Sequence, residues 1–331
     1  MVFAKQTYGE IVLIIKNEEN VLGFGDNKMF LQKIAPDFLG KVNCIYIDPP
    51  YAKNSDFLFK DGRIAYSDKI TGTNFIEGLK ERLLLSKPLL KEDGLVWIHM
   101  DWTICHYVKI MLDEIFGNDC FINEVIVKRT QKNDSGTTKR INVGHDVIYV
   151  YGASKNSRIK PVFKEIPEKE PYWHAFDAKG PGGAKSFGGT IISPPEGNHW
   201  RWSQERIDRE WANGTLRLNP KTGQPQYLVE AKKMQKLDTL WTDIQAYSFK
   251  TGYPTEKSQD LLKRIITAST EPGDYVMDFY AGSGSTGEAS MTLGRKYILC
   301  DRSPEALPII KKRLGVDISE DIFSKINEVA G

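Results

Sequence analysis

The chain has 331 residues, of which 40% are hydrophobic and 27% are charged, as expected for a soluble protein with one large domain or two modest ones. It has no apolar run of about 18 residues and no basic N-terminal region followed by a long apolar run, so we expect no membrane span, no secretory signal and a cytoplasmic location. The net charge of +2 says little, and the four scattered cysteines, with no C-x-x-C pair, predict neither disulfides nor a metal site.

The first 152 residues alternate strand-like and helix-like segments. Residues 42–47 form a short apolar run that ends at Asp48-Pro49-Pro50, which indicates a buried strand stopped by prolines. Helices are expected at residues 74–90 and 103–116, and further strands at residues 95–98, 121–127 and 146–151. This alternation predicts one half of an α/β domain over residues 1–152.

Residues 153–243 have a different composition. Prolines and glycines cluster, as in Gly180-Pro181-Gly182-Gly183, and no alternation of strands and helices is visible. Tryptophans recur at Trp173, Trp200, Trp202, Trp211 and Trp241. We expect an irregular insert or second lobe with a small core of its own.

Residues 244–331 return to the first pattern. Helices are expected at residues 258–270, 285–293 and 304–314, strands at residues 275–279 and 296–300, and a short surface helix at residues 317–331. Together with the first 152 residues, this predicts an α/β fold with a mainly parallel sheet covered by helices on both faces.

The segment from Asp278 to Gly287 joins a predicted strand to a predicted helix. Gly282 and Gly284 permit a tight turn and let the backbone approach a ligand closely. Asp301 ends the next predicted strand, about 19 residues beyond Gly282, where an acidic side chain can bind the two hydroxyls of a ribose.

Two alternatives exist for this turn. Gly282, Gly284 and Gly287 match the dinucleotide pattern G-x-G-x-x-G, which would suit a nicotinamide-dependent dehydrogenase. However, only one strand-helix unit follows the turn, whereas a dinucleotide fold carries this pattern on its first strand. Asp278 also suits the ammonium of a methionine-type ligand better than a pyrophosphate. The plainer alternative is a turn that binds no ligand.

The sequence Asp48-Pro49-Pro50-Tyr51 follows the first buried strand. Two prolines stiffen the backbone and remove two N–H donors, so the acceptors are the Asp48 carboxylate and backbone carbonyls. Asp48 and the Pro49 carbonyl can accept the two hydrogens of an amino group on a planar base, and Tyr51 can stack on the base. The alternative is a proline-stiffened loop with a capping aspartate.

Basic residues are concentrated between Lys128 and Lys160. Eight lie in this stretch, opposed only by Asp134 and Asp146: Lys128, Arg129, Lys132, Lys139, Arg140, Lys155, Arg158 and Lys160. Such a surplus suits a phosphate backbone, although a solvated loop face is the alternative.

Both motifs resemble those of one enzyme class. Asp48-Pro49-Pro50-Tyr51 resembles the catalytic motif of amino methyltransferases, and the segment from Asp278 to Gly284 resembles their S-adenosylmethionine motif. The catalytic motif comes first and an irregular segment separates the two, which is the order in β-class DNA N6-adenine methyltransferases. Gly25-Asp26-Asn27 and Tyr253-Pro254-Thr255-Glu256-Lys257 are also typical of that class, with Ser258 where the family often has proline.

A closer resemblance, over nearly the whole chain, is to the modification subunits of type III restriction-modification systems. It rests on four further segments: Phe116-Gly117 with Phe121-Ile122, Gly144-His145-Asp146-Val147-Ile148, Trp200-Arg201-Trp202-Ser203, and Leu240-Trp241-Thr242-Asp243-Ile244. The chain is shorter than those subunits usually are.

The resemblance implies a Rossmann-like methyltransferase fold that uses S-adenosylmethionine to methylate N6 of a flipped-out adenine. It divides the chain into a catalytic half (1–152), a target-recognition region (153–243) and a cofactor-binding half (244–331). The implied catalytic residues are Asp48, Pro49, Pro50 and Tyr51. The implied cofactor-site residues are Asp26, Lys257, Asp278, Phe279, Ala281, Gly282, Gly284 and Asp301.

Double-stranded DNA is the expected partner. From charge and from the recognition region, the expected DNA contacts are Lys132, Lys139, Arg140, Arg201, Arg206 and Arg217. A second copy of the chain and a restriction subunit stay open as partners, and no membrane partner is expected.

Four other assignments compete with adenine methylation. An N4-cytosine methyltransferase uses the same geometry but more often carries Ser-Pro-Pro-Tyr, and a protein glutamine methyltransferase usually carries Asn-Pro-Pro-Tyr and lacks the large insert. A catalytically silent DNA-binding subunit usually loses the Asp-Pro-Pro corner, which is intact here. A C5-cytosine enzyme needs a nucleophilic cysteine, usually after proline, and no cysteine here follows proline.

Overall fold

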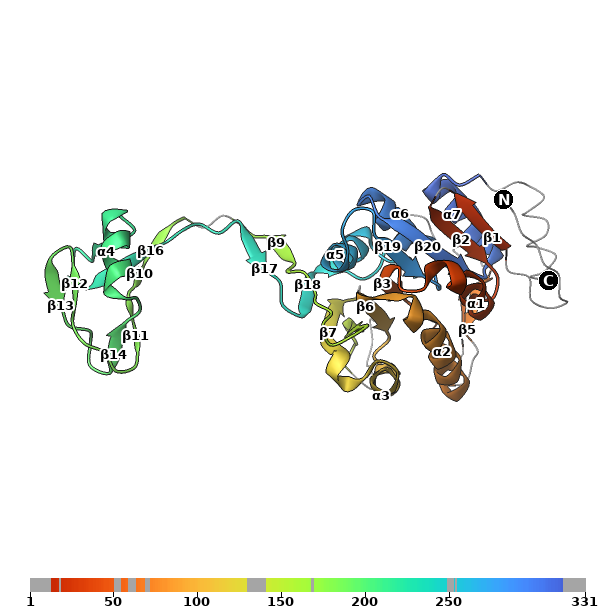
Figure 1. Ribbon diagram of the computed structural model, residues 1–331, viewed down its shortest axis with the longest axis horizontal. Helices are drawn as coiled ribbons and strands as arrows, with labels where there is room; N and C mark the ends of the chain where they lie inside the picture. The colour runs from red at the N-terminus through yellow and green to blue at the C-terminus, as the bar shows by residue number, and fades with distance from the viewer. Residues whose placement is uncertain are drawn as a thin grey trace. The chain divides into compact units, whose positions relative to one another are not determined.

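The computed structural model describes residues 13–17, 19–50, 55–58, 64–68, 72–129, 141–167, 170–248, 253 and 255–317, with only the backbone at 55–58, 64–68 and 72. The chain divides into two compact units. The large unit comprises Met1–Val162 and Leu237–Gly331, and the small unit comprises Phe163–Lys236 (Figure 1).

The large unit is built on a nine-stranded sheet. In spatial order the strands are β1 (Leu13–Asn17), β2 (Asn20–Phe24), β20 (Lys296–Asp301), β19 (Tyr275–Asp278), β3 (Val42–Ile47), β6 (Leu90–Met100), β8 (His145–Gly152), β7 (Phe121–Lys128) and β18 (Leu240–Gln245). Only β1 and β8 pair antiparallel with their neighbours. The remaining neighbours pair in parallel, which confirms the predicted mainly parallel sheet.

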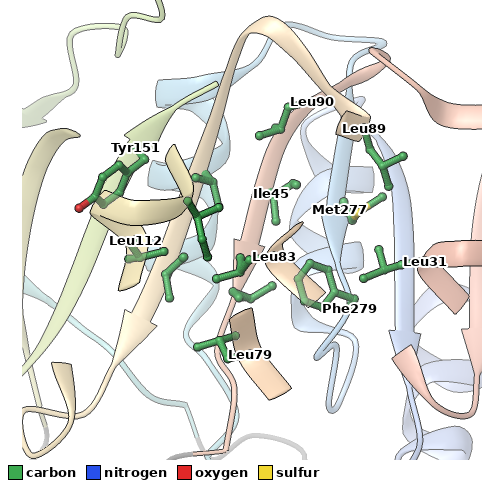
Figure 2. Close-up of a cluster of buried hydrophobic side chains, with 14 of the residues drawn as sticks. Leu31, Ile45, Leu79, Leu83, Leu89, Leu90, Leu112, Tyr151, Met277 and Phe279 are labelled. Atoms are coloured by element: carbon green, nitrogen blue, oxygen red, sulfur yellow. The ribbon is translucent and has the colours of Figure 1, made fainter. Parts of the chain in front are cut away.

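Helices cover both faces of this sheet. On one face lie α1 (Asn27–Phe38), α2 (Gly72–Ser86) and α3 (Cys105–Phe116); on the other lie α5 (Gln259–Ser269), α6 (Ser285–Thr292) and α7 (Leu307–Leu314). Because side chains alternate along a strand, Ile45 packs toward α1–α3 while its neighbours Cys44 and Tyr46 pack toward α5. Figure 2 shows Leu31, Leu83 and Leu112 of the first three helices around the strand residues Ile45 and Met277.

Local sequence explains where the helices start and stop. Ser258 caps α5, because its hydroxyl accepts a hydrogen bond from the Leu261 amide at 3.2 Å. The helix predicted at residues 74–90 is shorter than expected. It ends at Ser86, and a 3-10 turn, Lys87–Leu89, follows because Pro88 has no N–H to donate. Similar 3-10 turns span Asn118–Cys120 and Pro304–Ala306. Between β3 and α2, the strands β4 (Ser55–Leu58) and β5 (Ile64–Asp68) form a hairpin.

The small unit holds short strands rather than irregular chain. A three-stranded sheet consists of β10 (Tyr172–Ala175), β16 (Pro225–Val229) and β15 (Leu216–Leu218). Two-stranded ribbons consist of β11 (Asp177–Lys179) with β14 (Asn198–Trp200), β12 (Lys185–Phe187) with β13 (Thr190–Ile192), and β9 (Phe163–Glu165) with β17 (Met234–Lys236). The unit also contains one described helix, α4 (Gln204–Ala212).

Aromatic side chains form the core of the small unit, as the recurring tryptophans predict. The buried members are Phe176, Phe187, Trp200, Ile207 and Leu216. The Phe176 and Trp200 rings stack with centroids 6.0 Å apart, and the Trp200 indole N–H donates to the Ile192 carbonyl at 2.9 Å. An independent small core of this kind is what lets the segment form a compact unit.

The small unit is narrower than the predicted region 153–243. Ile159 and Val162 pack against the core beside α5, and β18 pairs in parallel with β7 at the edge of the large sheet. Residues 153–162 and 237–243 therefore belong to the large unit. The predicted helix at 317–331 lies outside the described residues apart from residue 317. Among the described ranges, no helix combines the length and the apolar character needed to cross a bilayer.

Candidate active site

Aspartates stand at the ends of five neighbouring parallel strands. Across the sheet they are Asp26 after β2, Asp301 in β20, Asp278 in β19, Asp48 after β3 and Asp101 after β6. Because carboxyl ends of parallel strands meet at one edge of a sheet, these residues line one edge. The chain leads from β3 toward β6 but from β19 toward β20, so the connections diverge between β3 and β19. Such a switch point is where open α/β sheets bind ligands.

The glycine turn lies on one side of the switch point. Gly282 and Gly284 have φ values of +50° and +77°, a region that side-chain-bearing residues seldom occupy. The Gly284 amide donates to the Ala281 carbonyl at 2.8 Å, and the Ala281 amide donates to the Cys300 carbonyl at 3.0 Å. A tight, glycine-dependent turn thus connects β19 to α6, as the sequence predicts.

Asp301 supports this turn from the next strand. Its Oδ2 accepts a hydrogen bond from the Gly282 amide at 2.7 Å, and its Oδ1 accepts one from the Ser303 amide at 2.8 Å. Burial raises the pKa of Asp301. A carboxylate can accept about four hydrogen bonds, so these two leave capacity for a hydroxyl ligand.

Asp278 is buried beneath the turn, with only 2% of its surface exposed. Its Oδ2 accepts from the Thr286 hydroxyl at 2.6 Å, and its Oδ1 accepts from the Tyr280 amide at 2.9 Å. Burial, together with the charges of Asp48 and Asp301, raises the pKa of Asp278 to about 7. A cationic ligand would relieve this crowding of carboxylates.

Two other predicted cofactor residues have structural contacts of their own. The Phe279 ring is fully buried in the core with Leu31 (Figure 2), so its side chain does not line the edge, although its carbonyl accepts from Asn27 Nδ2 at 2.8 Å. Asp26 caps α1 through the Lys28 and Met29 amides and pairs with Arg82 at 2.8 Å. The strand-end carbonyl of Asp301 accepts from the Gly25 amide at 3.0 Å, which brings Asp26 to the same edge.

The proline corner lies on the other side of the switch point. Asp48, Pro49 and Pro50 follow β3, whereas Tyr51 lies outside the described residues. Asp48 forms an ion pair with Lys257, whose side chain is only 6% exposed against 16% for Asp48. Lys257, predicted for the cofactor site, is therefore paired with the proline corner.

A polar cluster missing from the predicted site lies next to this ion pair. The Lys257 ammonium lies 4.4 Å from the centroid of the Tyr247 ring, and the Arg129 guanidinium lies 5.6 Å from the same centroid. Arg129 Nη1 bonds Asp101 Oδ2 at 3.0 Å and Asp146 Oδ1 at 3.1 Å. Arg129 is part of the basic stretch between Lys128 and Lys160, but it forms ion pairs with these two aspartates.

The same cluster extends into the sheet at His99. His99 Nε2 lies 3.4 Å from Asp146 Oδ2, and His99 Nδ1 is 3.1 Å from the Tyr46 hydroxyl. Burial would raise the pKa of Asp146, but His99 and Arg129 hold it below its ordinary value. Asp146 lies in the segment Gly144-His145-Asp146-Val147-Ile148, which carries part of the family resemblance, but that resemblance assigns it no role at the site. The signal that could have identified it and His99 is a polar residue inside an otherwise apolar strand.

Half of the predicted DNA contacts lie outside the described residues, and the other half lie in the small unit. Lys132, Lys139 and Arg140 lie outside the described residues. In the small unit, the Arg206 guanidinium lies 4.0 Å from the Trp202 ring centroid, and the Arg217 guanidinium lies 4.1 Å from that of Trp173. Arg201 Nε donates to the Asp177 carbonyl at 3.1 Å.

Cys44 is a buried thiol on β3, the strand that leads to Asp48. Burial raises the pKa of the Cys44 thiol to about 12, so this thiol stays protonated at neutral pH. Within the ranges that the structure covers, no three His, Cys, Asp or Glu side chains are grouped so as to hold a metal ion.

The chain is similar to several curated methyltransferases. It is 32% identical to the type II methyltransferase M.EcaI of Enterobacter cloacae over 316 residues, covering 88% of this chain and 69% of that protein. It is 50% identical to the type II methyltransferase M2.DpnII of Streptococcus pneumoniae, covering 89% of each. It is 28% identical to the StyLTI Mod subunit, a type III restriction-modification enzyme of Salmonella typhimurium, but spans only 57% of that subunit.

Solved structures share the fold of the chain. The M1.HpyAVI–SAM complex matches with a TM-score of 0.51 at 18% identity, covering 88% of this chain and 98% of that one. The cytosine-N4-specific PvuII DNA methyltransferase matches with a TM-score of 0.53 at 14% identity, covering 94% and 93%. These similarities show that the large sheet with helices on both faces is the S-adenosylmethionine-dependent methyltransferase fold.

The family model described as DNA methylase, which covers N6 and N4 methyltransferases, matches residues 42–312. This range contains the proline corner, the glycine turn and the small unit. The family uses S-adenosylmethionine as its methyl donor. The chain therefore belongs to the DNA methylase family of N6 and N4 methyltransferases, and it is a DNA methyltransferase.

Proposed function

We propose that this methyltransferase transfers a methyl group to the N6 amino group of an adenine flipped out of double-stranded DNA. The observation that carries the proposal is the position of Asp48 and the glycine turn on adjacent parallel strands, β3 and β19, on either side of the switch point. A base presented to Asp48 would thus lie next to a donor held at the turn.

The residues at the turn fit S-adenosylmethionine. Buried carboxylates suit its positive charges, and positive φ values at Gly282 and Gly284 let the backbone approach it closely. We assign Asp301 to its ribose hydroxyls and Asp278 to its ammonium group. When bound, the cofactor supplies an electrophilic methyl group on a sulfonium.

The proline corner would prepare the amino nitrogen. Asp48 and the Pro49 carbonyl accept its two hydrogens, which raises electron density on the nitrogen and directs its lone pair toward the methyl donor. Pro49 and Pro50 offer no N–H that would compete for these acceptors. We expect Tyr51, outside the described residues, to stack on the base once it has left the helix.

Adenine is favoured over cytosine by the corner itself. The family covers both N6 and N4 enzymes, and Asp48 stands where N4-cytosine enzymes more often have serine. Mass spectrometry of nucleosides from DNA treated with the enzyme is the direct test. N6-methyldeoxyadenosine is the expected product. N4-methyldeoxycytidine would establish the cytosine alternative, and DNA binding without methylation would favour a silent DNA-binding subunit.

We further propose that the small unit selects the target sequence. It presents arginines on aromatic rings, Arg206 on Trp202 and Arg217 on Trp173, and arginine is the residue that most often reads guanine. Replacing Phe163–Lys236 with the corresponding unit of a relative should change which site is methylated. A chimera that still methylated the original site would place recognition elsewhere.

The basic stretch between Lys128 and Lys160 would supply affinity without sequence choice. Neutralising Lys132, Lys139 and Arg140 together should weaken binding to all DNA alike and flatten its salt dependence. A restriction subunit as partner is suggested by the names of the Mod relatives, and a second copy of the chain remains a prediction. Mass measurement of the purified enzyme in solution would test the second copy.

A further inference from the structure

Two consecutive side chains connect the proline corner to the glycine turn. Lys257 forms the ion pair with Asp48, and Glu256 forms an ion pair with Arg313. Arg313 Nη1 in turn donates to the Ser283 carbonyl at 2.8 Å and to the Ser285 hydroxyl at 2.9 Å, both within or next to the glycine turn. Residue 257 thus contacts the proline corner directly, and residue 256 is linked to the glycine turn through Arg313, although Asp48 and Lys257 lie 209 positions apart in the sequence.

The Glu256–Arg313 pair is buried, and so is the Lys257 side chain, whereas Asp48 is partly buried. Glu256 and Arg313 are 3% and 7% exposed, close to the value for Lys257. Charges removed from water to this degree stay there only when paired, so each partner constrains the position of the other. Solvent-exposed pairs, by contrast, impose little geometry.

The backbone that carries Glu256 and Lys257 is fixed as well. Lys257 forms a β-bridge with Tyr247, and the Ser248 amide donates to the Glu256 carbonyl at 2.7 Å. The Ser258 amide donates to the Ala246 carbonyl at 3.0 Å, just before Ser258 caps α5. The backbone of neither residue can move far without breaking these bonds.

The backbone next to Glu256 and Lys257 is strained at Thr255. Its φ is +61°, in the left-handed region that a β-branched residue avoids. Among the described residues it is the one non-glycine with a positive φ. Such strain persists where the surrounding structure demands one conformation, and it concentrates at functional sites.

The Tyr247 ring provides a further contact for Lys257. The ammonium lies over one part of this ring, while Arg129, held by Asp101 and Asp146, lies near it as well. Cation–π contact favours the charged ammonium at this position. The Lys257 ammonium is therefore held by the Tyr247 ring as well as by Asp48.

We infer that Lys257 and Glu256 are positioning residues, which hold the Asp48 carboxylate and the glycine turn at the spacing that methyl transfer requires. This inference rests on the proposed function. It assigns Lys257 to the geometry of the proline corner rather than to cofactor binding. A misplacement of about 1 Å in such a site can lower the rate about 100-fold, so both residues should affect turnover more than binding.

The first test is Lys257→Ala in the full-length enzyme. We expect kcat to fall about 100-fold, while the dissociation constant for S-adenosylmethionine, from calorimetry without DNA, changes less than about twofold. Lys296→Ala is the matched control, because Lys296 pairs with Glu19 at the opposite end of β20. It should leave both quantities unchanged.

Chemical rescue separates positioning from loss of folding. Propylammonium, which matches the atoms removed in Lys257→Ala, should restore kcat at least about tenfold by re-forming the pair with Asp48, whereas propanol, of the same size but uncharged, should not. In an Asp48→Asn background, Lys257→Ala should cause little further loss, because a residue that acts through Asp48 has no effect without its charge.

If Lys257→Ala does not fold, Lys257→Met and Glu256→Gln, which keep side-chain length, provide the same readout. Each should lower kcat by at least about tenfold. Unchanged kcat in both variants, or a weakened cofactor affinity with kcat preserved in Lys257→Met, would overturn the inference. Wild-type enzyme without methyl transfer to any DNA would instead overturn the proposed function, and this inference with it.

Discussion

The large and small units differ in where their charged side chains lie. The large unit buries carboxylates and their partners at one edge of its sheet, including Asp278, Asp146 and Lys257. The small unit buries aromatic and aliphatic side chains and keeps its arginines at the surface, two of them stacked on tryptophans. Buried charges need a rigid surround that neutralises them, whereas recognition of DNA needs charges that can reach it.

The difference in scaffold fits the different roles that we propose for the two units. A nine-stranded sheet covered on both faces holds strand ends in fixed register, so groups on β3, β19 and β20 face one another without flexible linkers. The small unit has short strands around five buried residues and carries its side chains on a modest core. Chemistry and target choice should therefore respond separately to mutation.

The largest effect should come from Asp48→Ala. Removing the acceptor for the amino group should lower kcat by about 10²–10³-fold or more, because this contact acts in the transition state. Cofactor affinity should stay largely intact. Transfer of labelled methyl groups measures the first and calorimetry the second. Asp37→Ala is a suitable control, since Asp37 pairs with Lys16 on the surface. Near-normal turnover in Asp48→Ala would disprove the catalytic assignment.

Trp200→Ala tests whether the two units are independent. The side chain is 3% exposed in the core of the small unit, and truncation of a buried tryptophan costs about 3–5 kcal/mol. We expect the small unit to unfold at lower temperature and site selectivity to be lost, while the large unit still binds cofactor normally. Scanning calorimetry and cofactor titration measure both. Loss of cofactor binding would show that the units depend on each other.

Asp301→Ala should weaken cofactor binding rather than the chemical step. The loss of a charged acceptor costs about 1.5–3 kcal/mol, which corresponds to an increase in dissociation constant of roughly 10- to 100-fold. Part of the effect would come from the Gly282 amide, which loses its partner at 2.7 Å. Calorimetric titration is the measurement. A dissociation constant equal to that of the wild type would move the cofactor site elsewhere.

Arg217→Ala should alter sequence choice and leave turnover on the best site nearly unchanged. A base contact by arginine is worth about 1–3 kcal/mol of discrimination. The Arg217 guanidinium lies 4.1 Å from the centroid of the Trp173 ring, and its Nε lies 3.3 Å from Gln226 Oε1. Sequencing of methylated bases in DNA from expressing cells would show relaxed choice at one position. Arg209→Ala, which removes a residue paired with Glu210, is the control. Identical methylation patterns would argue against a reading role.

The smallest effect concerns pH and Asp278. Its pKa is raised from 3.8 to about 7, so between these values the folded state holds a proton that the unfolded state has released. The contribution of Asp278 to the free energy of unfolding therefore decreases as pH rises from about 4 to about 7. Relative to Asp278→Asn, wild type should be less stable at pH 8 than at pH 5. Urea unfolding at both pH values measures this, and a pH-independent difference would contradict the burial of the charge.

Much of the large unit could be predicted from sequence because its determinants are local. The glycines at 282 and 284, the prolines at 49 and 50 and the helix cap Ser258 act on their own backbone. Alternating strands and helices then predict a parallel sheet, whose strand ends must share an edge. The boundaries of the small unit were harder to predict, because Val162 and β18 join the large unit through contacts with residues distant in the sequence.

The two motifs and their order can be recognised in the amino-acid sequence alone. Which groups meet depends on the assembled fold. Lys257 lies next to Asp48, Glu256 next to Arg313, and Arg129 between Asp101 and Asp146. A buried charge takes the partner that folding places beside it, because the desolvated pair is stable only at close range. The separation of two residues in the sequence does not predict their distance in the fold, so these contacts are seen only in the assembled sheet.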